Sequence, residues 1–148
     1  MMKAIQFLAV VLTALVLVPS GAHLFELPNK INLAENDYFI VQSIYRGWSL
    51  FGIALILALA ANLALTMSLR GHGAAAVFAL TGFVCLAVTL AVFFVFTFPA
   101  NEATDNWTTV PADWRDLRWR WEISHAVNAV IIFIGFCSVT LAVMLARR

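Results

Sequence analysis

Two short motifs place a histidine beside a glutamate in an otherwise apolar chain. His23 and Glu26 form a His-x-x-Glu, and Glu122 and His125 form a Glu-x-x-His. A spacing of three residues puts both members of each motif on one face of a helix. Imidazole and carboxylate side chains act as general acids and bases or as ligands for a transition metal. These motifs are therefore the first candidates for chemistry.

The reversed order of the two motifs matters if antiparallel helices carry them. With a rise of about 1.5 Å per residue, both glutamates then lie about 4.5 Å nearer the same end of the bundle than both histidines. The four side chains would meet at matched depths. Pro19 lies one turn before His23, where it removes a backbone hydrogen bond and bends the helix. This bend could open space beside the imidazole.

Further polar and aromatic residues lie at the same level as the motifs. Arg118 stands four residues before Glu122, where it could keep that carboxylate ionised or bind an oxygen of a ligand. Tyr45 and Trp48 begin another apolar run, and Asn101 follows a third. We expect the last three to border a substrate pocket that is apolar below and polar above. Such a pocket suits a flat hydrophobic molecule with an oxygen at one edge.

The histidines and glutamates leave three kinds of site open. A single metal ion could be held by His23, Glu26, Glu122 and His125. A haem could be held by the two histidines if their separation leaves room for one. A structural alternative pairs each histidine with a nearby glutamate. A full di-iron set is absent, because it takes a glutamate from each of two further helices and the other apolar runs contain none. Since ionisable residues inside a membrane are functional by default, we favour a functional site.

Composition places these motifs in a membrane protein. Of the 148 residues, 63% are hydrophobic and 11% are charged, and the mean hydropathy is +0.92. A soluble domain has roughly 25% charged residues, so this chain lacks the polar surface it would need in water. The net charge of +1, without a stripe of Lys and Arg, gives no sign of a nucleic-acid partner. The expected partners are the membrane and a hydrophobic small molecule or lipid.

Four apolar runs each approach the ~20 residues that a helix needs to cross a bilayer. The runs cover about 4–27, 48–69, 74–98 and 123–146, with longer loops at 28–47 and 99–121. We predict an all-α fold with a single transmembrane domain over residues 1–148. The domain would be a four-helix up-down-up-down bundle. Its outer-face segment would contain a short amphipathic helix, starting near Asp113.

The basic residues indicate how the bundle is oriented. Lys3, Arg70 and Arg147–Arg148 flank the runs at one face, whereas the two longer loops mix basic residues with acidic ones. The positive-inside rule then predicts a multi-pass protein of the cell's inner (plasma) membrane with both termini in the cytoplasm. The first run and the small residues from Pro19 to Ala22 also fit a cleavable signal peptide, which would leave three spans. We favour four.

Other polar residues within the runs indicate helix packing. Asn62 and Asn128 are expected to form hydrogen bonds between helices. Thr81, Cys85 and Thr89 recur every four residues and form one narrow stripe. We interpret this stripe as a close-packing face whose hydroxyl groups bond to their own helix or to a neighbour.

A pattern of Pro, Asn, Trp, Arg and His residues runs through the last third of the chain. It comprises Phe98-Pro99-Ala100-Asn101-Glu102-Ala103-Thr104, Asn106-Trp107, Pro111, Trp114, Leu117-Arg118, Trp121-Glu122 and Ser124-His125-Ala126. This pattern resembles the signature of the DUF1772, or anthrone-oxygenase-like, membrane proteins. The layout of four spans with an outer first loop agrees with that family.

The resemblance implies a small membrane oxygenase for an aromatic, ketone-bearing substrate. Family members with a named activity oxidise an anthrone to an anthraquinone with molecular oxygen. The matching catalytic positions here are Trp107, Trp121 and His125, with Asn101, Arg118 and Glu122 in support. His125 would be the general base that removes a proton from an activated carbon before oxygen attacks. Such chemistry can run without a cofactor, and the resemblance leaves a metal at His23 and His125 open.

Two other classes of function compete with an oxygenase. One is a binding protein for a metal, a haem or a lipid-like molecule, without catalysis. The other is an accessory subunit of a larger membrane complex, with the Trp-rich segment as its contact surface. Nothing in the sequence predicts the oligomeric state.

Overall fold

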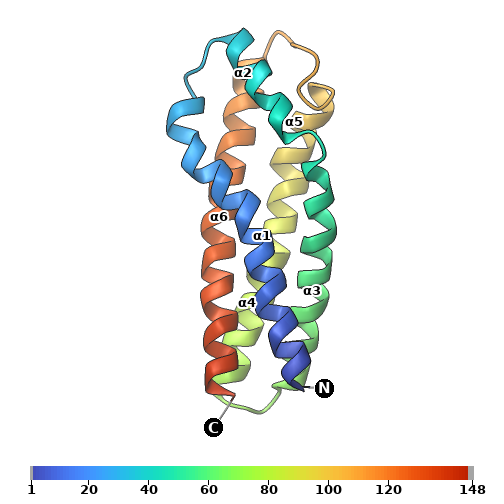
Figure 1. Cartoon of the computed structure of the whole chain (residues 1–148), viewed down its shortest axis with the longest axis vertical. Coiled ribbons are helices and arrows are strands. Elements are labelled where there is room, and N and C mark those ends of the chain that lie inside the picture. Colours follow the sequence, from blue (N-terminus) through green and yellow to red (C-terminus); the bar gives the residue numbers. More distant parts are fainter. Residues whose placement is uncertain (1, 147–148) are drawn as a thin grey trace.

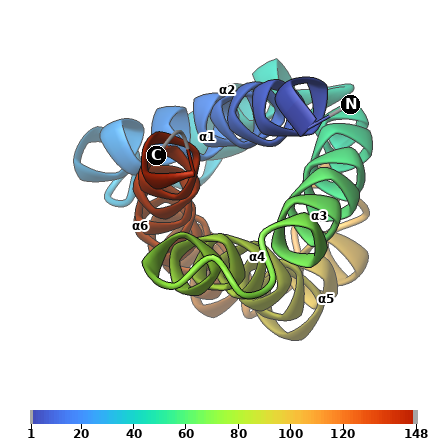
Figure 2. The ribbon, with the colours of Figure 1, turned by 90° about the horizontal axis from the view of Figure 1, so that it is seen from below.

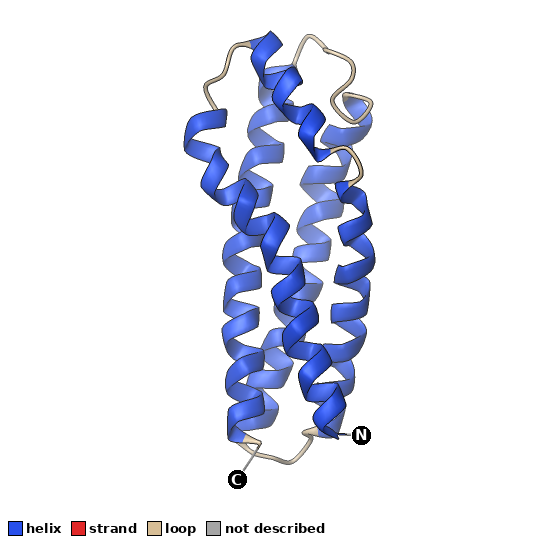
Figure 3. Ribbon diagram, in the orientation of Figure 1, coloured by secondary structure: helices blue, strands red, loops and turns tan. Residues whose placement is uncertain are grey.

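The computed structural model of this chain describes residues 2–146, and its regular secondary structure there is all helical, with loops between the helices (Figure 3). The elements are α1 (Met2–Lys30), α2 (Glu35–Gln42), the 3₁₀ turns η1 (Ser43–Tyr45) and η2 (Trp48–Leu50), α3 (Phe51–Ser68), α4 (Ala74–Val92), the π-helical η3 (Phe93–Thr97), α5 (Phe98–Ala103) and α6 (Trp114–Leu145). The prediction of an all-α four-helix bundle is confirmed. Arg147–Arg148, used above for the orientation, lie outside the described residues.

Four helical stretches are long and apolar enough to cross a membrane. They are α1, Trp48–Ser68, Ala74–Ala103 and α6, with 29, 21, 30 and 32 residues. Their outward side chains are large and apolar: Phe7 is 65% exposed, Ile53 61% and Val77 63%. A surface of this kind is stable against lipid but not against water. The structure thus supports a multi-pass membrane protein.

The four stretches lie side by side along the long axis of the molecule (Figure 1). The start of α1, the end of α6 and the turn between α3 and α4 lie at one end of the bundle, which we call the termini end. The opposite end, which we call the α2 end, carries α2, α5 and the loop 104–113. Seen along the axis, α1 neighbours α3 and α6, and α4 neighbours α3 and α6 (Figure 2).

The helices at the α2 end are longer than the apolar runs predicted. The predicted loop 99–121 is largely helix, because the third stretch continues to Ala103 and α6 already begins at Trp114. The predicted loop 28–47 contains the end of α1, then α2 and η1. Hydropathy misses these turns because they are polar on one side. They remain helical because Tyr38, Trp107 and Trp114 pack together in one buried cluster there.

Small residues bring α4 and α6 close together. A Cβ atom added to Gly82 would clash with Cγ2 of Val139, and one added to Gly135 would lie 3.0 Å from Cβ of Cys85. Val139 is fully buried and its branched side chain has little freedom to turn away. As in other membrane bundles, close packing of small residues substitutes for a hydrophobic driving force.

The polar groups in the middle of the bundle are used for packing, as predicted. Asn62 donates to Thr13 Oγ1 on α1 at 3.0 Å, and Asn128 donates to the Thr89 carbonyl on α4 at 3.3 Å. The hydroxyl groups of Thr81 and Thr89 each donate to the carbonyl four residues earlier. Both predictions, hydrogen bonds between helices and hydroxyls bonded to their own helix, are confirmed.

Pro99 shapes the helix that carries Asn101 to the α2 end. It has no N–H for the carbonyl four residues earlier, and its ring crowds that carbonyl. The turn just before it, Phe93–Thr97, is π-helical, an irregularity that is frequent near functional sites. Thr97 is buried there, and its Oγ1 lies 2.7 Å from Oγ of Ser124 on α6. This contact ties the irregular turn to the helix that holds His125.

The tight contact of α4 with α6 predicts a difference between two glycine substitutions. Gly82→Ala should lower the free energy of unfolding by about 1–3 kcal/mol, because the added methyl group overpacks the contact. Gly52→Ala is the matched control, since nothing lies within 4 Å of its added Cβ; it should be neutral or stabilising by up to about 1 kcal/mol. Unfolding in detergent, followed by circular dichroism, measures both. Equal effects would contradict the close contact.

Candidate functional site

A buried ion pair joins α1 to α6 at the α2 end. Lys30 Nζ lies 3.0 Å from Glu122 Oε1, and the two side chains are 3% and 0% exposed. Lys30 is the last residue of α1, and Glu122 lies in the third turn of α6. Charges removed from water are costly unless they are paired and hydrogen-bonded. The surroundings of this pair are therefore expected to be rich in hydrogen bonds.

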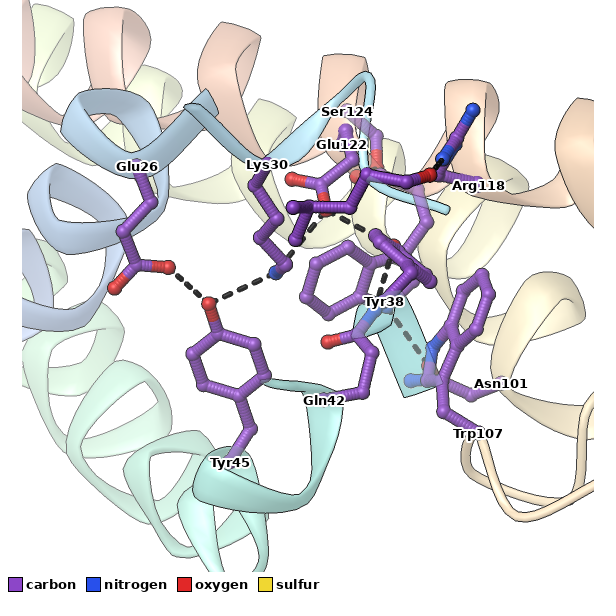
Figure 4. A network of polar contacts seen from close by, with 12 residues as sticks. Glu26, Lys30, Tyr38, Gln42, Tyr45, Asn101, Trp107, Arg118, Glu122 and Ser124 are labelled. Carbon is purple, nitrogen blue, oxygen red and sulfur yellow. Dashed lines mark hydrogen bonds and ion pairs between the residues drawn. The ribbon is translucent and has the colours of Figure 1, made fainter. Parts of the chain in front are cut away.

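On the α6 side, α2 supplies those hydrogen bonds (Figure 4). The Tyr38 hydroxyl donates to Glu122 Oε1 at 2.9 Å, and Gln42 Nε2 donates to the Tyr38 oxygen at 2.6 Å. Tyr38 and Gln42 are four residues apart, so both project from one face of α2 toward the bundle. These hydrogen bonds hold the short helix α2 over the N-terminal part of α6.

On the α1 side, Lys30 Nζ donates to the Tyr45 hydroxyl at 2.8 Å, and Tyr45 donates in turn to Glu26. Tyr45 belongs to η1, so the turn after α2 is also bound to α1. Burial raises the pKa of Tyr45, and the hydrogen bond to Glu26 raises it further. Burial and the nearby Glu122 carboxylate likewise raise the pKa of Tyr38. Both hydroxyl groups therefore stay protonated and donate at neutral pH.

The two histidines stack on each other beside this network. The ring centroids of His23 and His125 are 4.2 Å apart, with 32° between the planes. Trp121 lies 4.2 Å from His125 and 5.0 Å from His23, while Tyr45 and Trp48 lie 4.5 and 5.5 Å from His23. The motifs on α1 and α6 thus meet as their reversed order predicted, and aromatic rings surround the imidazole pair.

Neither imidazole is bound by a glutamate. His23 is 5% exposed, and its Nδ1 is buried without a hydrogen-bond partner among the described residues. His125 is half-buried. The carboxylates of Glu26 and Glu122 bond instead to Tyr45, Lys30 and Tyr38. The structural alternative of two His–Glu pairs is therefore wrong, and the imidazole nitrogens are free for a proton or a ligand.

The predicted metal set is not assembled either. Within residues 2–146, no three His, Cys, Asp or Glu side chains converge on a point that could hold a metal ion. Lysine and tyrosine partners draw Glu26 and Glu122 away from the histidines. Haem ligands point their nitrogens at the iron from opposite sides. The ring centres of His23 and His125, in contrast, are only 4.2 Å apart, which leaves no room for a porphyrin between them.

Arg118 is not the cation beside Glu122. Its Nη1 donates to the Leu33 carbonyl at 2.8 Å, and its guanidinium lies 4.7 Å from the ring centre of Trp114 and 5.3 Å from that of Tyr38. The helical spacing correctly put Arg118 one turn from Glu122. The segment between α1 and α2, however, passes over α6 and offers a carbonyl to the guanidinium, while Lys30 takes the place beside the carboxylate. Arg118 thus binds the segment between α1 and α2 to α6.

Asn101 forms hydrogen bonds with two of the tryptophans that were predicted as site residues. Its Oδ1 accepts hydrogen bonds from Trp107 Nε1 at 3.1 Å and Trp121 Nε1 at 2.8 Å. Trp121 is the ring that lies against both histidines. Asn101 therefore acts through Trp121, as a residue that positions the aromatic surroundings of the imidazole pair.

The loop that carries Trp107 has an unusual backbone. Asp105, Asn106 and Trp107 have φ angles of 48°, 54° and 66°, in the left-handed region that L-residues rarely adopt. The Trp107 N–H donates to Thr104 Oγ1 at 3.0 Å, and the buried indole bonds to Asn101. Strained backbone of this kind persists only where the surroundings hold it, and it is frequent at functional sites.

Sequence reasoning missed Lys30, Tyr38 and Gln42. All three lie in what was predicted as a loop, although one signal was available. Lys30 follows Glu26 by four residues and His23 by seven, so it shares their helix face once α1 continues past Leu27. Pro28 concealed this, because a proline usually ends a helix, whereas α1 runs through it to Lys30.

The chain was also compared with known protein families, curated proteins and solved structures, and no match was found.

The ion pair predicts that Lys30→Met is strongly destabilising. An unpaired buried carboxylate costs about 3–5 kcal/mol, so the free energy of unfolding should fall by that amount. The double variant Lys30→Met/Glu122→Gln removes both charges and should regain most of the loss. Lys3→Met, at the exposed termini end, is the matched control. Unfolding in detergent tests all three, and a Lys30→Met as stable as Lys3→Met would refute a buried pair.

The two tyrosines predict a dependence on alkaline pH. The chain has only these two, and the folded state raises the pKa of both above the ordinary value of about 10. Folding therefore holds their protons more tightly, and the free energy of unfolding should fall as the pH rises above about 10. Absorbance at 295 nm should show tyrosinate only as the protein unfolds. Ionisation near pH 10 with the helices intact would contradict the buried network.

Proposed function

We propose that this protein is a membrane-embedded oxygenase, or a related redox enzyme, of the anthrone-oxygenase-like (DUF1772) kind. Its substrate would be a hydrophobic, aromatic, ketone-bearing small molecule bound at the α2 end. The observation that carries this proposal is the stacked His23–His125 pair, with a buried free nitrogen, inside a wall of aromatic rings. The walls suit a flat aromatic molecule, and a neutral imidazole is the usual general base near pH 7.

In this proposal His125 removes a proton from a CH₂ group that lies between two aromatic rings, both of which are conjugated with a carbonyl. The resulting carbanion spreads its charge over the flat molecule and reacts with molecular oxygen. Overall, R₂CH₂ + O₂ gives R₂C=O + H₂O. One oxygen atom enters the new carbonyl and the other leaves as water, and the carbon loses the four electrons that dioxygen gains. His23 stacks on His125 and holds its ring in place.

Glu122 has a supporting role in this proposal. Its Oε1 receives hydrogen bonds from Lys30 and Tyr38, so the carboxylate is held between α1 and α2. Glu122 lies directly after Trp121 and three residues before His125 in α6. By binding this turn of α6 to α1 and α2, the carboxylate holds His125 and the neighbouring Trp121 ring in position.

We also propose that the α2 end faces outward from the plasma membrane, with the termini end in the cytoplasm. Among the described residues, Lys3 near the start of α1 and Arg70 between α3 and α4 are the charged residues of the termini end. The α2 end mixes both signs, with Glu35 and Asp37 in the first turn of α2 and basic residues such as Arg115 at the start of α6. The orientation proposed here rests on the termini end being basic without acidic residues, as the positive-inside rule expects of a cytoplasmic face.

A second candidate function, lipid binding without catalysis, is favoured by a groove on the membrane-facing side of α1 and α6. The groove has a volume of about 370 Å³ and is lined by Leu24, Ile123, Ala126, Val127, Val130 and Ile131. All six are apolar, so the groove suits an acyl chain or a similar hydrocarbon tail. Oxygen consumption separates the two functions, because a lipid-binding protein consumes none.

The proposed base predicts the outcome of a histidine substitution. His125→Ala should lower anthrone-dependent oxygen consumption roughly 10²–10⁴-fold, the contribution of a positioned general base. The matched control is His72→Ala, in the exposed turn between α3 and α4 at the termini end. It should retain full activity. An oxygen electrode measures the rate, and circular dichroism verifies that both variants are folded.

Two results would count against the proposal. If His125→Ala and His72→Ala are equally active, the base lies elsewhere. If the wild-type protein binds an anthrone but consumes no oxygen, binding without catalysis is the better description.

A further inference from the structure

A second groove lies at the termini end, between the first turns of α1 and the last turns of α6. The start of α1 lies toward α3 and the end of α6 lies on the other side, so the two helices separate there (Figure 2). This termini-end groove has a volume of about 950 Å³, which is within the range of ligand sites in proteins. Its lining includes Lys3, Gln6, Phe7 and Val10 of α1 and Thr140 and Met144 of α6.

The polar and apolar parts of the termini-end groove are separated along its length. Lys3 lies in the first turn of α1, about 10 Å along the helix axis from Val10. The inner lining is apolar except for Thr140, whose hydroxyl group already donates to the Phe136 carbonyl at 2.8 Å. The inner part therefore suits a hydrocarbon chain, whereas the mouth offers the ammonium group of Lys3 and the amide of Gln6.

The charge at the mouth of this groove is positive and is not compensated by an acidic side chain. All eight acidic residues of the chain lie between positions 26 and 122, at or near the α2 end. Among the described residues, the only ion pair is that of Lys30 with Glu122. An anionic group next to an apolar chain is therefore the chemistry that complements both parts of the groove.

We propose that the termini-end groove binds one phospholipid with an anionic headgroup, taken from the surrounding bilayer. The phosphate group accepts hydrogen bonds from Lys3 and Gln6, and one acyl chain lies between Phe7 and Met144. These two side chains border the groove from α1 and α6 and are 65% and 60% exposed, so an acyl chain has large apolar surfaces to cover. The site lies at the opposite end of the bundle from His23 and His125, and it is independent of the proposed oxygenase chemistry.

The test compares two lipids that have the same acyl chains and differ in headgroup charge, dioleoyl-phosphatidylglycerol and dioleoyl-phosphatidylcholine. Native mass spectrometry of the full-length protein in detergent resolves the binding of the first lipid molecule. The wild-type protein should bind the first phosphatidylglycerol about fivefold more tightly than the first phosphatidylcholine, the effect of one basic residue beside an anionic lipid. Equal affinities, or binding of neither lipid, would overturn the proposal.

A pair of charge variants locates the headgroup. Lys3→Gln should abolish the preference for phosphatidylglycerol while leaving the affinity for phosphatidylcholine unchanged, which also shows that the variant is folded. Arg70→Gln is the matched control, because Arg70 lies at the same end of the bundle, between α3 and α4, but does not line the groove. It should retain the preference. An equal loss in both variants would show a diffuse attraction of charges and would refute a site at Lys3.

A pair of phenylalanine variants locates the acyl chain. Phe7→Ala should weaken the binding of both lipids about tenfold, because an apolar wall of the groove is lost. Phe94→Ala is the matched control, since Phe94 is similarly exposed, at 56%, and lies in η3 outside the groove. If Phe7→Ala binds both lipids as tightly as Phe94→Ala does, the acyl chain is not in the groove and the assignment fails.

Glycerol 3-phosphate separates a lipid from a soluble anion. It carries a phosphate group without acyl chains, so an excess of it should not displace phosphatidylglycerol from the wild-type protein. Displacement would show that the mouth binds phosphate alone, which would contradict a lipid site.

Discussion

The structure of the whole α2 end depends on one ion pair, between Lys30 and Glu122, that is buried in an apolar bundle. Neither charge is tolerable alone in such surroundings, so the chain must bring both together and surround them with hydrogen bonds. This requires α1 to continue through Pro28 as far as Lys30, and it requires α6 to be in place at Glu122. It also accounts for α2, whose Tyr38 donates a further hydrogen bond to the carboxylate. The arrangement of the α2 end thus depends on one ion pair.

The ion pair also determines which groups contact the two histidines. Both glutamates that could have bound them are bound to lysine and tyrosine partners, so His23 and His125 stack on each other among aromatic rings instead. Asn101 adds to this arrangement from the third stretch by holding the Trp121 indole. The proposed acid–base chemistry and aromatic binding would therefore depend on these anchoring residues as well as on the two histidines.

The apolar runs and the two histidine motifs were predictable, because hydropathy and helical spacing depend on local sequence alone. The matched depth of His23 and His125 follows from the same spacing once the helices are antiparallel. The partner of Glu122 was not predictable in that way. Arg118 had the right spacing within α6, but the choice between Arg118 and Lys30 depends on where α1 ends and how the chain crosses to α2. Likewise, no local signal shows that Trp107 takes a left-handed backbone or that its indole shares an acceptor with Trp121. Such features are set by contacts between segments far apart in the sequence.

The apolar groove between α1 and α6 has a kinetic consequence. Lifting α2 away from the bundle would remove Tyr38 from a buried carboxylate, so exchange of the proposed ligand past α2 would be slow. Hydrophobic molecules, however, already concentrate in the bilayer, and the groove lies at the level of the histidines, with Leu24 directly following His23. A lateral route along it needs no charge to be exposed. It follows that the rate of occupancy would scale with the amount of ligand dissolved in the lipid rather than in water, and would respond to the lipid-to-protein ratio of the preparation.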